Sequence, residues 1–267
     1  MSFISLNFVV LFACTFILYH TLPSRFRKAT LLTASCLFIG FYHLAFLITA
    51  LILTLTTFYL GKWIGQAKRE SGMKGIYFSG VCFLVVSWLA FRYADRLTNC
   101  HILFPLGISF YTFQAISYLT EIYWQEEEPE KSLPDFMIYM LFFMKFLSGP
   151  IERASDMLPQ LKSCKATDYT SMVYGMRLIV VGLIKKLILA DSIAPYIDGV
   201  FGSVYTASGV QLLMACLLYP IELYADFSGY TDIALGGARM LGFKLSPNFN
   251  RPFIAPVSYT HLRAHET

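Results

Sequence analysis

Long apolar runs separated by short polar connections dominate this chain. The run 29–60 is long enough for two short crossings, and His43 lies near the point where such a hairpin would turn. The pattern predicts an all-α, polytopic transmembrane helical bundle of about seven to eight spans, some short or broken. The runs that predict these spans are 3–19, 29–60, 75–92, 103–123, 133–149, 172–190 and 207–225.

The composition also indicates a membrane protein. Of the 267 residues, 56% are hydrophobic and only 14% are charged, and the mean hydropathy is +0.56. A soluble domain usually carries about 25% charged residues. If 29–60 is a hairpin, the basic segments 25–28 and 62–74 fall on one side, and the positive-inside rule makes that side cytoplasmic. No basic residue precedes the first apolar run, which therefore predicts a span rather than a cleaved signal peptide.

Metal and disulfide chemistry have little support in the sequence. The six cysteines are scattered and include no Cys-x-x-Cys pair. His261 and His265 have a His-x-x-x-His spacing, but a metal-binding helix would need a third ligand and further structure to hold it. Both histidines lie in the last seven residues, so we predict no metal site.

Polar residues recur within one of the apolar runs. Tyr111, Gln114, Tyr118 and Glu121 are spaced by three, four and three residues, which places them along one stripe of a helix. Such a stripe faces either neighbouring helices, through hydrogen bonds, or a water-filled cavity.

A Gly-Pro dipeptide at 149–150 ends another apolar run, and Glu152 and Arg153 follow it directly. Backbone groups freed at membrane depth must be covered by protein or water. Two interpretations fit this segment. It is either a helix end whose charges reach the lipid headgroups or a broken helix beside a substrate path.

The segment ADFSGYTD is the most polar part of the last apolar region. Asp226 and Tyr230 are four residues apart and share a helix face, as do Ser228 and Asp232. The two aspartates are six residues apart and point in different directions, so a paired-carboxylate catalyst is poorly supported. The small residues of 234–238 permit close helix approach, and part of this motif is therefore predicted to serve packing.

Five motifs occur along the chain in a fixed order: FPLGISFYTFQ at 104–114, SGPIERA at 148–154, GLIKKLILAD at 182–191, DFSGYTDIA at 226–234 and NFNRPF at 248–253. Together they resemble the membrane-bound O-acyltransferase family, in particular its bacterial branch of alginate O-acetyltransferases and teichoic-acid D-alanylation proteins. The resemblance covers nearly the whole chain up to about residue 255. It implies that residues 1–255 form the N-terminal portion of an O-acyltransferase domain.

Members of this family move an acyl group from a thioester donor to a hydroxyl. The resemblance implies a multi-pass protein of the bacterial inner membrane that O-acetylates an exported polysaccharide. It implies acetyl-CoA or an acyl carrier protein as donor, and no bound cofactor. The expected partners are the lipid bilayer and the exported polysaccharide or a periplasmic esterase-like acyltransferase, with no nucleic acid. The residues expected to line or support the reaction tunnel are Gln114, Glu152, Arg153, Asp226, Tyr230, Asp232, Asn250 and Arg251.

The resemblance also implies a proton-accepting histidine, which the family carries in a Trp-His pair after the NFNRPF-type segment. After Ala255 the sequence departs from the family pattern, so we interpret 256–267 as a tail produced by truncation of the gene. His261 and His265 therefore do not inherit the catalytic role. We expect no catalytic residue in this chain, and an inactive 267-residue product.

Other functions remain open from the sequence. D-alanyl transfer to teichoic acids is the alternative within the enzyme class. A transporter or channel, with broken segments at Gly107 and Gly149-Pro150 as its substrate path, is the alternative from another class, although no two related halves are visible. A non-enzymatic membrane scaffold also fits the composition.

Overall fold

The computed structural model describes residues 5–67, 69–98, 105, 107–147, 149–164 and 167–248. Every regular element within them is a helix, which confirms the predicted all-α fold. The elements are α1 (Leu6–Thr21), α2 (Ser24–Tyr42), α3 (Leu44–Gln66), α4 (Glu70–Thr98), α5 (Ile108–Tyr123), α6 (Leu133–Leu141), α7 (Ala154–Ser163), α8 (Tyr169–Leu183), the π-helix η1 (Ile184–Ala190), α9 (Asp191–Gly202) and α10 (Gly209–Met240).

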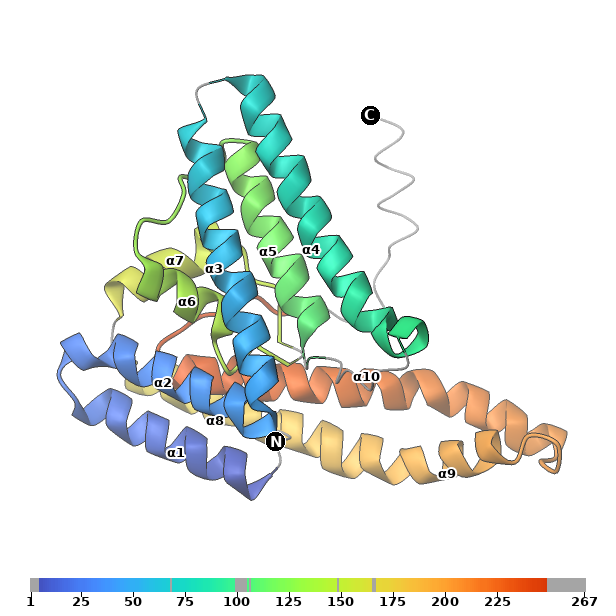
Figure 1. Ribbon diagram of the computed structural model, residues 1–267. Helices are drawn as coiled ribbons and strands as arrows, with labels where there is room; N and C mark the ends of the chain where they lie inside the picture. The colour runs from blue at the N-terminus through green and yellow to red at the C-terminus, as the bar shows by residue number, and fades with distance from the viewer. Residues whose placement is uncertain are drawn as a thin grey trace, which may run out of the picture.

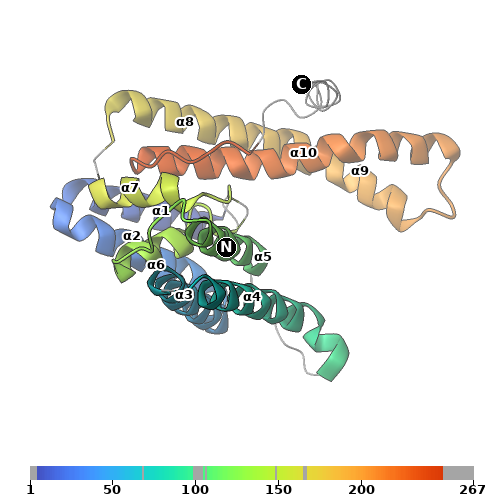
Figure 2. The ribbon, with the colours of Figure 1, turned by 90° about the horizontal axis from the view of Figure 1, so that it is seen from above.

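Two groups of helices cross one another (Figure 1). Helices α3, α4 and α5 stand side by side. Helices α8, η1 and α9 lie along α10, and this second group crosses the lower end of the first in the view of Figure 1. Seen from above, α8 and α10 form one edge of the molecule, and α1, α2, α6 and α7 lie between that edge and α3 (Figure 2). Among the described residues, α3, α4 up to Tyr93, and α10 are long and apolar enough to cross a membrane. The expected seven to eight spans are therefore not confirmed.

The run 29–60 is divided at His43, as the hairpin interpretation predicts. Helix α2 ends at Tyr42 and α3 begins at Leu44, because His43 has an extended backbone. The Nδ1 atom of His43 accepts a hydrogen bond from the N–H of Ala45 at 3.2 Å and so caps the start of α3. The polar residue within the apolar run thus marks the boundary between two helices.

The prediction of a membrane span over 133–149 is wrong. Helix α6 contains nine residues and ends at Leu141, and the described residues 142–147 and 149–153 form turns and irregular backbone. Nine residues give a helix of about 14 Å, which is too short for a hydrocarbon core of about 30 Å. The run is apolar because it forms the core: Phe136, Tyr139 and Phe142 are fully buried within the protein.

Glycines bring α8 and α10 into close contact. A Cβ added to Gly175 or Gly182 would lie 2.6 Å from the carbonyl oxygen of Gly236 or Gly229, respectively. The two glycines on each helix are seven residues apart, so the close approach recurs every two turns. This contact confirms that small residues of the 234–238 region serve helix packing.

The charge of the acidic connection between α5 and α6 would suggest that it is solvated, but part of it is buried. Glu130 is only 4% exposed. One carboxylate oxygen accepts hydrogen bonds from the N–H groups of Lys131 and Ser132, and the other lies 2.8 Å from Lys162 Nζ at the end of α7. Burial raises the pKa of Glu130, but the Lys162 ammonium and the two N–H groups outweigh burial and hold the pKa below its ordinary value.

We predict that Gly182→Leu lowers the melting temperature of the purified chain in detergent, because a side chain there meets the backbone of α10. Overpacking of this kind costs about 1–3 kcal/mol. Gly199→Leu on α9 is the matched control, since nothing lies within 4 Å of a Cβ at that position. The control gains helix propensity and should be neutral or slightly stabilising. Equal stability of the two variants would refute the close contact.

We predict that Glu130→Gln destabilises the chain at neutral pH and has little effect in acid. A carboxyl group with a lowered folded-state pKa stabilises the fold above its unfolded pKa, and this contribution is lost as the pH falls through the folded value. The difference in melting temperature between wild type and variant should therefore shrink below about pH 4. Glu128→Gln, which removes an exposed pair with Lys131, is the control and should change little.

Candidate functional site

Tyr139 on α6 lies at the centre of a buried polar network. Its hydroxyl donates to the backbone carbonyl of Glu152 at 3.0 Å, and its own backbone carbonyl accepts from the Gln114 side-chain amide at 2.8 Å. These bonds tie α5 and the segment after Gly149-Pro150 to α6. Gln114 thus makes an interhelical hydrogen bond, the first of the two roles considered for its stripe.

The polar stripe of α5 faces the protein interior along its length. Tyr111, Gln114, Tyr118 and Glu121 are each at most 5% exposed. The Tyr118 hydroxyl accepts from the Glu130 N–H at 3.0 Å, which fixes the loop before α6. The spacing of these residues therefore predicted their common face correctly.

Lys145 places a cation within the same network. It is 3% exposed, and its Nζ lies 4.5 Å from the centroid of the Tyr139 ring, within range of a cation–π interaction. Its Nζ has no hydrogen-bond partner within the part of the chain that the structure describes. Lys145 lies outside the candidate spans, and burial lowers its pKa, against the opposing effect of the Glu152 charge.

Glu152 is a buried carboxyl group of the same network, with an exposed fraction of 1%. Its Oε1 accepts from the Ser246 N–H at 2.5 Å, and its Oε2 accepts from the Ser246 hydroxyl at 3.1 Å. A carboxylate held in this way does not reach lipid headgroups. Arg153 is exposed and precedes the first residue of α7.

A second polar cluster joins η1 to α10. Lys186 Nζ lies 2.5 Å from Asp226 Oδ1 and 2.8 Å from Asp191 Oδ1. It also lies 5.4 Å from the centroid of the Tyr230 ring. Asp226 and Tyr230 therefore share a face of α10, as their spacing predicts. The π-helical geometry of η1 is uncommon and often occurs at functional sites.

The neighbouring Lys185 binds the other aspartate of this motif. Its Nζ lies 2.6 Å from Asp232 Oδ2. Asp226 and Asp232 thus point in different directions, and each has its own lysine. The arrangement gives no support to a catalytic carboxylate pair, and both contacts hold α10 against η1.

The predicted tunnel residues fall into separate groups. Gln114 and Glu152 meet through Tyr139, whereas Asp226, Tyr230 and Asp232 belong to the cluster on α10. Among the described residues, the Arg153 side chain forms no hydrogen bond or ion pair with either group. Asn250 and Arg251, like His261 and His265, lie outside the described residues.

Sequence reasoning missed three lysines of these clusters. Lys145 lies inside a run that the sequence analysis interpreted as a membrane span. A charge within a span is costly and often marks a functional site, so the sequence did contain a signal for this lysine. Lys185 and Lys186 belong to a recognised motif, but nothing in their spacing showed that they would reach two aspartates on another helix.

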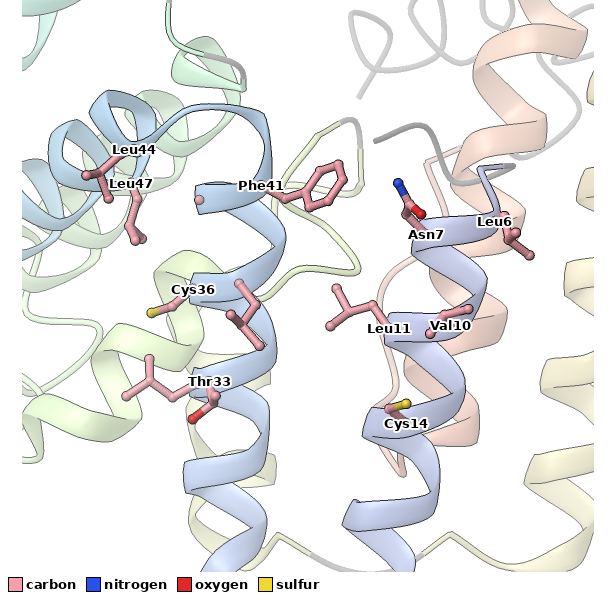
Figure 3. A pocket seen from close by; sticks show the side chains of 13 residues that line it. Leu6, Asn7, Val10, Leu11, Cys14, Thr33, Cys36, Phe41, Leu44 and Leu47 are labelled. Atoms are coloured by element: carbon pink, nitrogen blue, oxygen red, sulfur yellow. The ribbon is translucent and has the colours of Figure 1, made fainter.

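An apolar groove lies apart from both clusters (Figure 3). It has a volume of about 1070 Å³ and is formed by α1, α2 and the start of α3. Leu6, Val10, Phe41 and Leu44 are among its lining residues, and Asn7 lies at the same end of α1 as Leu6. It shares no residue with the two polar clusters, so we do not assign acyl-transfer chemistry to it.

These features define an all-α membrane protein with ion pairs and hydrogen-bonded polar side chains inside the fold. The model of the membrane-bound O-acyltransferase family, MBOAT, matches residues 129–263, which is half of the chain. The chain belongs to the membrane-bound O-acyltransferase family.

Its curated relatives are bacterial. It is 33% identical to a probable alginate O-acetylase of Azotobacter vinelandii, over 96% of this chain and 54% of the relative. It is 29% identical to a peptidoglycan O-acetyltransferase of Helicobacter pylori, over 86% and 51%. It is also 29% identical to a teichoic acid D-alanyltransferase of Bacillus subtilis, over 56% and 38%. The chain spans about half the length of the alginate and peptidoglycan relatives.

We predict energetic coupling between Lys145 and Glu152. The two side chains form no ion pair among the described residues, but the Glu152 charge opposes the effect of burial on Lys145, and leaving a buried charge uncompensated typically costs about 3–5 kcal/mol. Lys145→Met and Glu152→Gln should each destabilise the chain strongly, and the double variant should lose less than the sum of the two. A double-mutant cycle on unfolding in detergent measures this coupling, and additive losses would show that the two charges do not interact.

Proposed function

We propose that the protein carrying this chain is a membrane O-acyltransferase that transfers acetyl groups from a thioester donor to hydroxyls of an exported polysaccharide. The main support is the similarity to a probable alginate O-acetylase along 96% of this chain, which includes the motifs that form both polar clusters. The similarity to a peptidoglycan O-acetyltransferase points to the same reaction class and the same kind of acceptor.

The described residues support this reaction by building its framework. Acyl transfer to a hydroxyl needs a proton acceptor, and a thioester must be protected from water. We assign the proton acceptor to the family's histidine after the NFNRPF-type segment, and not to His261 or His265. Gln114 and Glu152 organise the buried network, and Asp226, Tyr230 and Asp232 hold the helix pair. Arg153, Asn250 and Arg251 are proposed to lie near the tunnel.

We further propose a multi-pass topology in the bacterial inner membrane, with residues 1–255 as part of the acyltransferase domain. The donor in this proposal is acetyl-CoA or an acyl carrier protein on the cytoplasmic side. The acceptor is the polysaccharide itself or a periplasmic partner that completes the transfer. No resident cofactor or metal is part of the mechanism.

D-alanyl transfer to teichoic acids is the second candidate, supported by the match to a teichoic acid D-alanyltransferase. That match covers 56% of the chain, against 96% for the alginate relative, which favours acetylation. Neighbouring genes distinguish the two. A carrier protein with its adenylating ligase would favour D-alanylation, whereas polysaccharide synthesis genes would favour acetylation.

We predict that the complete reading frame at this locus restores acetyl esters to the exported polysaccharide of a host that lacks its own O-acetylase. The 267-residue chain, expressed alone at the same level, should restore none, because the proton acceptor is assigned outside it. Ester content of the purified polymer is the measurement. Acetylation by the short chain would contradict this assignment, and D-alanyl esters or solute uptake without ester formation would favour the alternatives.

A further inference from the structure

The segment that follows α10 has no regular secondary structure, and residues 243–246 alternate between buried and exposed. Helix α10 ends at Met240, Gly242 then adopts the left-handed conformation at φ +88°, and the Phe243 N–H donates back to the Ala238 carbonyl at 2.9 Å. Beyond this turn Phe243 and Leu245 are buried. A chain in this conformation forms no backbone hydrogen bonds of its own, so its position depends on other groups.

Gln160 on α7 binds both backbone polar groups of Lys244. Its Oε1 accepts from the Lys244 N–H at 2.7 Å, and its Nε2 donates to the Lys244 carbonyl at 3.0 Å. The same Nε2 donates to the Asp156 carbonyl at 2.8 Å, which fixes the amide on its own helix. The Gln160 side chain therefore hydrogen-bonds to the backbone of Lys244 as a residue of a neighbouring β-strand would.

Glu152 holds the same segment two residues further along. Its two carboxylate oxygens accept from the N–H and the hydroxyl of Ser246, as described above. Glu152 is itself fixed, since its backbone carbonyl accepts from the buried Tyr139 hydroxyl. Lys244 and Ser246 are thus bound at successive outward-facing positions by two side chains from 152–160.

We propose that Gln160 and Glu152 form a clamp that positions residues 243–248, up to Asn248 at the start of the NFNRPF-type motif, for acyl transfer. The proposal rests on the proposed function. Glu152 is expected from the sequence to line or support the tunnel, and its contacts are those of a positioning residue. Gln160 carries the same role and lies in none of the five motifs. The clamp acts on the backbone of Lys244, so it requires no particular side chain there.

The clamp is tested with Gln160→Leu in the complete reading frame, assayed in membrane vesicles with radiolabelled acetyl-CoA as donor probe and the unacetylated polysaccharide as acceptor. Misplacement of reacting groups by about 1 Å can lower a rate about 100-fold. We expect kcat to fall by about 10- to 100-fold, with KM for acetyl-CoA nearly unchanged. Gln160→Glu keeps the acceptor for the Lys244 N–H but loses both donated bonds, and should fall between wild type and Gln160→Leu.

Gln211→Leu is the matched control. Gln211 also makes local hydrogen bonds, to Ser208 at the start of α10, but it does not touch the segment 243–248. The control should lose helix stability and keep kcat. If Gln160→Leu changes melting temperature and leaves kcat as in the control, Gln160 is merely structural and the proposal is overturned.

Backbone hydrogen exchange tests the clamp independently of activity. In Gln160→Leu, the peptide covering 243–248 should exchange faster, while peptides from α10 should not change. Unchanged exchange of that peptide would overturn the clamp even in an active protein. If wild type transfers no acetyl group and the peptide still loses protection in the variant, the clamp holds and the proposed donor or function fails.

Discussion

A carboxylate shielded from water must be bound by hydrogen bonds, and Glu152 is the residue through which this requirement organises the fold. Its side chain binds Ser246, which is 94 residues away in the sequence, and its backbone carbonyl binds Tyr139. The α6 core, the irregular segment after it and the chain leaving α10 therefore depend on one another. A change in any of these three alters the environment of the other two.

The contact between α8 and α10 depends on a different physical constraint. In lipid the hydrophobic effect contributes little to helix association, so close packing and polar contacts must hold the helices together. Paired glycines allow the backbones to approach, and Lys185 and Lys186 then reach aspartates on α10. The DFSGYTD motif therefore combines a packing surface with two ion pairs, and its aspartates stabilise the contact between α10 and η1.

Local pattern predicted those features that depend on local chemistry. The stripe on α5 and the helix boundary at His43 follow from the spacing or position of single residues, and both were found as expected. The prediction of a span over 133–149 was wrong because an apolar run indicates burial but does not distinguish burial in lipid from burial in a protein core. The partners of Glu130 and Glu152 come from α7 and from beyond α10, and no periodicity within one helix reports such distant contacts.

The described part of the chain uses most of its interior charges to hold segments together, and this bears on where the chemistry lies. A group that must accept a proton or bind a substrate has to be available, whereas Glu152, Asp226 and Asp232 are already engaged by Ser246, Lys186 and Lys185. These contacts fix the positions from which the chain continues toward Asn250. In the function that we propose, the reacting groups are not among these engaged carboxylates, and the stability of the framework limits how accurately such groups are placed.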